Sequence, residues 1–159
     1  MQTTFVLSFL AASASAMVHI PRQGGVNPAV IPQDFGVKAG DGRDTIQVGS
    51  CVGANQKLIP CQCPPAPNDP DFLGKLSQGL SQGFFPDPSV PIPISLAEFN
   101  DASDTSIETQ KRRGTAMIQV LQSLNGPKGS GCPGVAAPNL VKLQQTGQIG
   151  AGSVGNAGK

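Results

Sequence analysis

The sequence predicts a mainly α fold: a small disulfide-stapled helical bundle with a short N-terminal β-hairpin and loops rich in proline and glycine. Three observations support this prediction. Apolar residues recur at helical spacing after N-terminal capping signals. Four cysteines are available to form disulfides. Glycine and proline supply 20 and 15 of the 159 residues. Because only 38% of the chain is hydrophobic, and tryptophan and tyrosine are absent, the predicted core is small.

The first 16 residues have the composition of a secretory signal peptide. An apolar run over residues 5–12 precedes small residues, among which Ala14-Ser15-Ala16 fits a cleavage site. The run is too short to cross a bilayer of about 30 Å, and no later run in the sequence reaches that length. We therefore expect a secreted, extracellular protein that does not associate with a membrane.

The rest of the chain divides into a leader, one domain and a tail. Residues 17–44 carry proline and glycine without a sustained apolar period, which predicts a flexible leader or linker. Residues 147–159 are rich in glycine and offer almost nothing to bury, so we expect a disordered tail. The predicted domain is therefore 45–146. It begins with a strand over residues 45–48, followed by a turn and a return strand over residues 52–59.

Four cysteines in a small exported chain predict two disulfides. A bridge between Cys61 and Cys63 would span a single residue and be strained, so one of them should reach Cys51 and the other Cys132. Of the two pairings that remain, we favour Cys51–Cys61 with Cys63–Cys132, whose long bridge closes about 70 residues. The alternative, a zinc site with four thiolates, requires paired Cys-x2-Cys spacings that the sequence lacks. We therefore expect no metal and no other cofactor.

The first helix is predicted over residues 69–85, with Asn68 or Asp69 as its cap. Its apolar face consists of residues four positions apart, namely Phe72, Leu76, Leu80 and Phe84. Farther along, Ser95-Leu96-Ala97-Glu98 has the spacing of a capping box and predicts one short helical turn.

The strongest helix signal follows a second capping box, Thr105-Ser106-Ile107-Glu108. Asn125-Gly126-Pro127 supplies the stop signal for this helix. Its predicted apolar face consists of Ile107, Met117, Ile118, Leu121 and Leu124. A last short helix is predicted from Pro138 to Thr146.

Two motifs typical of enzymes are interpreted as chance matches. Gly79-Leu80-Ser81-Gln82-Gly83 fits a serine nucleophile, but it lies inside a predicted helix, whereas that nucleophile requires a sharp turn from strand to helix. The only histidine, His19, lies beside the signal cleavage site, so the predicted domain lacks the usual general base. Residues 150–155 fit a dinucleotide fingerprint, but only four residues follow where a helix is needed. We assign no catalytic residue.

A hydrolase that uses two carboxylates is the remaining enzymatic hypothesis. Most acidic residues of the predicted domain lie beside helix starts, where they interact favourably with the helix dipole, so we interpret them as structural. The acidic residues of the predicted domain are Asp69, Asp71, Asp87, Glu98, Asp101, Asp104 and Glu108.

Lys111-Arg112-Arg113 is the only run of charge in the sequence, and we interpret it as a solvated helix face. Two further interpretations stay open: a dibasic processing site, and a docking patch for an acidic partner. The net charge of +1 and the lack of tyrosine and tryptophan predict no binding to nucleic acid.

Four short motifs surround the cysteines: Cys-Val-Gly-x-Asn at 51–55, Pro-Cys-x-Cys-Pro-Pro at 60–65, Asn-Gly-Pro at 125–127 and Gly-Cys-Pro at 131–133. In these motifs the chain resembles small secreted cysteine-containing proteins of filamentous fungi. The resemblance implies a shared scaffold but brings no catalytic residues. Some small secreted fungal proteins act as effectors or elicitors directed at a host, and others remain at the fungal wall.

We therefore expect a secreted, non-enzymatic monomer, effector-like or elicitor-like, that binds an unidentified extracellular protein or wall component. The first alternative is a structural or surface-associated protein of the fungal wall or matrix. The second is the carboxylate-dependent hydrolase, for which Glu98 and Glu108 are the best candidates.

Overall fold

The structure, a computed structural model, describes residues 25–39 and 50–149. Within these residues the chain is mainly α, with four α-helices, a small antiparallel sheet and two disulfides. The helices are α1 (Pro70–Gln82), α2 (Leu96–Asn100), α3 (Ile107–Gln122) and α4 (Pro138–Thr146). The other elements are the strands β1 (Lys38–Ala39), β2 (Ser50–Val52) and β3 (Leu58–Pro60), and the 3-10 turns η1 (Pro28–Val30), η2 (Ala54–Gln56) and η3 (Gly134–Ala136).

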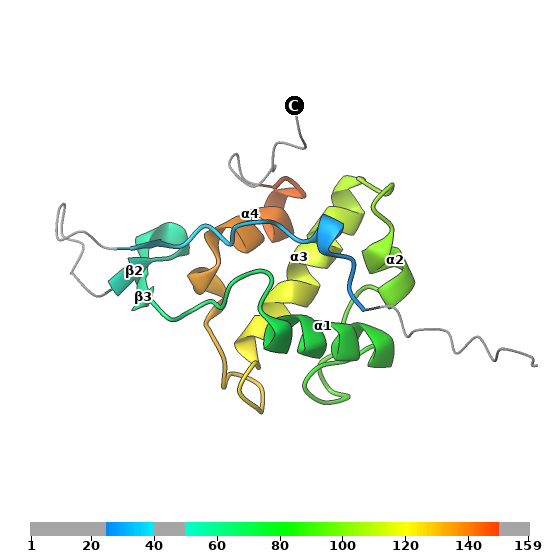
Figure 1. Cartoon of the computed structure of the whole chain (residues 1–159), viewed down its shortest axis with the longest axis horizontal. Coiled ribbons are helices and arrows are strands. Elements are labelled where there is room, and N and C mark those ends of the chain that lie inside the picture. The colour runs from blue at the N-terminus through cyan, green and yellow to red at the C-terminus, as the bar shows by residue number, and fades with distance from the viewer. Residues whose placement is uncertain (1–24, 40–49, 150–159) are drawn as a thin grey trace, which may run out of the picture.

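Helix α3 lies at the centre of the helical part, in contact with α1, α2 and α4 (Figure 1). Its residues Met117, Val120 and Leu121 are at most 1% exposed. The main core also includes apolar side chains from the three surrounding helices, among them Phe72, Leu76, Phe99, Leu140 and Leu143. Helix α3 therefore holds the domain together, and changes on its buried face are expected to affect all four helices.

Helix α1 confirms the predicted first helix but ends earlier than expected. Asp69 is its N-cap and accepts hydrogen bonds from the backbone N–H groups of Asp71 and Phe72, both at 3.0 Å. The helix stops at Gly83, whose φ of 81° is left-handed and favours glycine. Because the chain turns there, Phe85 enters the core, while the predicted face residue Phe84 is only half-buried.

The two capping boxes differ in outcome. Ser95 and Glu98 form the predicted box at the start of α2. At α3 the N-cap is Ser106 rather than Thr105, and its hydroxyl accepts from the N–H of Thr109. The placement of Ile107 on the buried face is wrong, since its exposed fraction is 55%. Ile107 lies two residues before the buried Thr109, which is about 200° around a helix.

Helices α3 and α4 approach closely at Gly114. A Cβ atom on this residue would lie 2.7 Å from the backbone nitrogen and 3.0 Å from the Cα atom of Gln144, so α4 would have to move. On α1, by contrast, a Cβ atom at the exposed Gly74 would meet no atom within 4 Å.

Gly114→Ala is therefore expected to lower the free energy of unfolding by about 2 kcal/mol, because it overpacks a backbone contact. Gly74→Ala is the matched control and is expected to raise it by about 0.5–1 kcal/mol, since alanine favours the helix. Urea unfolding of both variants checks this pair. Equal effects of the two substitutions would contradict the close packing of α3 on α4.

The sheet has the order β1-β2-β3 with antiparallel pairing throughout. In the hairpin of β2 and β3, Cys51 pairs with Ile59. The bridges are Cys51–Cys61 and Cys63–Cys132, so the favoured pairing is confirmed. The first of these bridges staples the hairpin. The strand predicted over residues 45–48 lies outside the described residues.

The prediction of a flexible leader is wrong for residues 25–39, which belong to the folded domain. Phe35 is 2% exposed, and its ring meets the edge of Phe72 with the centroids 5.5 Å apart. The Asn27 backbone N–H donates to the Asn100 side-chain oxygen at 2.7 Å, and the Asn27 side chain donates to the Asn100 carbonyl at 3.1 Å. This segment lacks helical or strand periodicity because its apolar residues are buried by distant parts of the chain.

Outside this segment, the rest of the predicted leader is not among the described residues, and neither are residues 150–159 of the predicted tail. Gly147 ends α4 with a φ of 70°, and the described chain continues to Ile149. Among the helices within the described ranges, none is both long and apolar enough to cross a membrane.

Candidate functional site

The three residues of the basic run have different environments. Lys111 and Arg112 are partly exposed and pair with carboxylates: Lys111 Nζ lies 3.8 Å from Glu108, and Arg112 Nη1 lies 3.1 Å from Glu98. Arg113 is only 1% exposed. The interpretation of the run as a solvated face is therefore wrong for Arg113, which is directed into the domain.

The buried guanidinium of Arg113 donates hydrogen bonds to backbone carbonyls at the end of α2 and in the following loop. Nε donates to Phe99 at 3.0 Å, and Nη1 donates to Asp104 at 2.8 Å. Nη2 donates to Glu98 at 3.2 Å and also to Asp101. Because the last carbonyls of a helix have no partner within the helix, Arg113 supplies the hydrogen bonds that α2 cannot make internally.

Burial lowers the pKa of Arg113, and the nearby carboxylates of Asp104 and Asp101 act in the opposite direction. Asp104 is held in place from two sides, since it accepts from the Thr109 hydroxyl at 2.7 Å and from the Ser106 N–H at 2.9 Å. Hydrogen bonds from Thr109 and Ser106 lower the pKa of Asp104 from its ordinary value of 3.8 to about 2. Asp104 and Arg113 thus join the start of α3 to the end of α2.

A lowered carboxyl pKa predicts loss of stability in acid. The contribution of Asp104 is fully present above about pH 3.8 and is lost as the pH falls towards about 2, because the folded state then has to take up a proton. Asp104→Asn should make the stability vary less across this pH range. The measurement is urea unfolding at several pH values, with Glu108→Gln as a control that removes another carboxylate from the same end of α3. An unchanged pH profile in Asp104→Asn would contradict the assignment.

Most of the acidic residues named from the sequence have structural partners. Asp69 caps α1, Glu98 completes the box of α2, and Asp101 accepts from the Ser103 N–H at 2.9 Å. Ser81, the serine of the nucleophile-like motif, lies within α1 and donates to the Ser77 carbonyl at 2.8 Å. In the described part of the chain, no group of three histidine, cysteine, aspartate or glutamate side chains is arranged to hold a metal ion. His19 and residues 150–155 lie outside that part.

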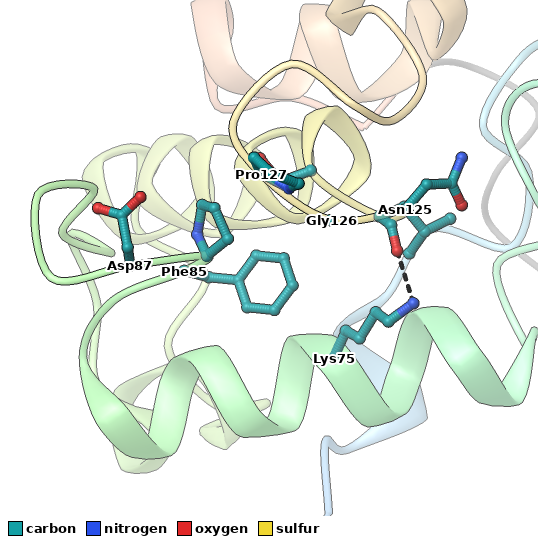
Figure 2. A pocket seen from close by; sticks show the side chains of 9 residues that line it. Lys75, Phe85, Asp87, Asn125, Gly126 and Pro127 are labelled. Atoms are coloured by element: carbon teal, nitrogen blue, oxygen red, sulfur yellow. Dashed lines mark hydrogen bonds between the residues drawn. The ribbon is translucent and has the colours of Figure 1, made fainter.

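An open pocket of about 610 Å³ lies between α1, the turn after it, and the chain that follows α3. Figure 2 shows its side chains. Helix α1 contributes Lys75, and the other lining residues come from the two loop segments: Phe85, Pro86, Asp87, Ser123, Leu124, Asn125, Gly126 and Pro127.

Two turns shape the walls of this pocket. In the first, the Phe85 N–H donates to the Val90 carbonyl at 3.0 Å, and the Ile92 N–H donates to the Gly83 carbonyl at 2.9 Å. In the second, Gly126 has a φ of 143°, and its N–H donates to the Ser123 carbonyl at 3.2 Å. Because backbone hydrogen bonds hold both walls, the pocket is formed before any ligand arrives.

Lys75 connects the two sides of the pocket. Its ammonium group donates to the Leu124 carbonyl at 2.5 Å, the dashed contact in Figure 2, and pairs with Asp71 at 2.7 Å. Asp87 stands at the other end, where it accepts from the backbone N–H of Ser89 at 2.9 Å. Hydrogen bonds from the Ser89 side chain and backbone lower the pKa of Asp87, so its carboxylate is charged in neutral and mildly acidic solution.

This pocket is not predicted from the sequence. Asp87 was predicted only as one of the acidic residues and Asn125-Gly126-Pro127 only as a helix stop, and neither Lys75 nor Phe85 was predicted as a site residue. The one available signal was the Asp71–Lys75 pair at helical spacing, which orients the lysine on α1. The partner carbonyl lies 49 residues away, at Leu124, a distance in sequence that local patterns do not bridge.

No protein-family profile, no curated protein and no solved structure matches the chain.

Proposed function

We propose that this chain is a secreted, non-enzymatic protein that acts by binding an extracellular partner through the pocket between α1 and the chain after α3. In this proposal it is an effector-like member of the small secreted proteins of filamentous fungi that its cysteine motifs resemble. A monomeric, disulfide-stapled helical bundle presents the site.

The observation that carries the proposal is the pocket. Its walls are held by backbone hydrogen bonds, and its lining combines one ammonium group and one carboxylate with apolar surface. A preformed concave surface with a few polar groups is typical of binding sites. The two disulfides support the proposed location, because such bridges persist mainly in oxidising compartments.

The location is tested with natively secreted protein. Culture fluid and wall extract are compared by intact mass before and after reduction, and the proposal expects a species in the fluid that gains four hydrogens on reduction of its two bridges. Retention inside the cell would contradict the proposal. Recovery from the wall fraction alone would favour a structural role instead.

Binding is tested by partner capture with the oxidised protein. Asp87→Asn removes the exposed negative charge of the pocket, and Lys142→Met is a control that changes an exposed charge of α4 outside the pocket. We expect a partner retained by the unmodified protein and by Lys142→Met but lost with Asp87→Asn. Capture that ignores the pocket substitution would contradict the proposed site.

A further inference from the structure

We propose that the pocket binds a short peptide with free termini, with the peptide's ammonium group at Asp87 and its carboxylate at Lys75. This inference rests on the proposed function and deepens it by naming the class of ligand. It follows from the arrangement of charge and apolar surface along the pocket.

The Asp87 end can accept a cation. Both contacts from Ser89, one from its N–H and one from its hydroxyl, go to the same carboxylate oxygen, Oδ1. The second oxygen, Oδ2, has no hydrogen-bond partner among the described residues, and the side chain is exposed. An ionised carboxylate can accept several hydrogen bonds, so Asp87 can bind an ammonium group without giving up Ser89.

The Lys75 end can donate to an anion. An ammonium group has three N–H donors, and two of them are used by Asp71 and the Leu124 carbonyl. One donor is left, and the lysine side chain is 31% exposed. Asn125 also lines the pocket, but its carboxamide points away from the lysine ammonium group in Figure 2. The remaining donor of Lys75 can form a hydrogen bond to a carboxylate.

Between the two ends the lining is apolar. Phe85 and Pro127 lie between Asp87 and Lys75 in Figure 2. Pro86, the residue after Phe85, also lines the pocket. A ligand that satisfies the whole pocket therefore has one positive end, one negative end and an apolar body. Asp71 and Lys128 add charges of their own at the two ends, Asp71 as the ion-pair partner of Lys75 and Lys128 as a positive charge near Asp87. A peptide with both termini free has the required pattern, and its length can be adjusted by about 3.3–3.6 Å per extended residue.

The test is an NMR titration of the oxidised full chain with Gly-Leu-Gly, its N-acetylated form and its C-amidated form. We expect shift changes at the pocket residues with the free peptide, and binding about tenfold weaker when either terminus is blocked, because each block removes a charged hydrogen bond. Glycine-leucine peptides of two to five residues then show which length spans the pocket.

Asp87→Asn and Lys75→Met connect each terminus to its residue. N-acetylation should weaken binding in the unmodified protein but cause no further loss in Asp87→Asn, and C-amidation should behave in the same way with Lys75→Met. Lys142→Met, outside the pocket, is expected to respond to both blocks as the unmodified protein does. The blocked peptides test both contacts in the unmodified protein as well, so the experiment stands even where Lys75→Met lowers stability.

Two results would overturn the inference: no shift change at the pocket with any peptide, or equal binding of free and blocked peptides. Either result, together with successful partner capture that depends on Asp87, would remove the peptide ligand and leave the proposed function intact. Capture that does not depend on Asp87 would remove the proposed site itself.

Discussion

Arg113→Met is expected to lower the free energy of unfolding by about 4 kcal/mol. Methionine fills part of the same volume but cannot donate, so the carbonyls of Glu98, Phe99, Asp101 and Asp104 lose a shared charged partner inside the domain. Each buried carbonyl left unsatisfied costs about 1–3 kcal/mol, and the cost is smaller at the partly buried carbonyls and at Asp101, whose carbonyl keeps the N–H of Asp104 as a partner. Because the four carbonyls belong to α2 and the loop before α3, we expect loss of order in this region first.

The matched control for Arg113 is its neighbour, Arg112. Arg112→Met removes a partly exposed ion pair with Glu98 and is expected to cost at most about 1 kcal/mol. Arg113→Lys tests the role of geometry, since an ammonium group retains the charge but lacks the planar fork that reaches four carbonyls. Urea unfolding at neutral pH measures all three variants. A cost for Arg113→Met as small as that for Arg112→Met would contradict the buried position of this side chain.

Replacing Cys63 and Cys132 together by serine is expected to lower the free energy of unfolding by about 4 kcal/mol. The two residues are 69 positions apart, and the bridge between them restricts the unfolded chain over that length. The bridge also connects the end of the hairpin to the segment between α3 and η3. Cys132 is 4% exposed and packs with Ile59 and Ala136, so its loss also disturbs the smaller core beside the sheet.

The control removes the other bridge. Cys51 and Cys61 are 10 positions apart, and the same chain-entropy relation gives about 3 kcal/mol for this pair. Urea unfolding of both double variants, with the free thiols counted, compares the two bridges directly. A larger loss from the short bridge than from the long one would show that restriction of the unfolded chain is not the dominant contribution.

Where local hydrogen bonding and periodicity decide the structure, the sequence predicted it correctly. The capping box at Ser95 and Glu98, the cap at Asp69 and the helix from Pro138 to Thr146 all occur as expected. Each is encoded by residues within one or two turns of one another, so the local sequence carries its signal, while tertiary packing stabilises helices this short. The sequence also narrowed the disulfide pairing, because the short Cys61–Cys63 spacing excluded one of the three pairings, and the favoured one of the remaining two occurs.

The candidate site could not be predicted from such local patterns. The pocket combines Lys75 of α1 with Asp87 and Asn125 from two loops, and no local pattern connects these residues. Phe85 lines it only because Gly83 ends α1 three residues earlier than the predicted helix. Apolar spacing placed Phe84 on the buried face, whereas the turn after Gly83 selects Phe85.

The sequence by itself determined that helices form and roughly where they begin, that Cys61 and Cys63 bond to Cys51 and Cys132 rather than to each other, and that the core is small. Only the tertiary structure decided that Phe35 belongs to the core and that Arg113 is buried while Arg112 is partly exposed. Both outcomes depend on partners far along the chain: Phe72 for Phe35, and the carbonyls at the end of α2 for Arg113. Burial of a side chain is a property of the surfaces that meet it, and those surfaces exist only once the helices have packed.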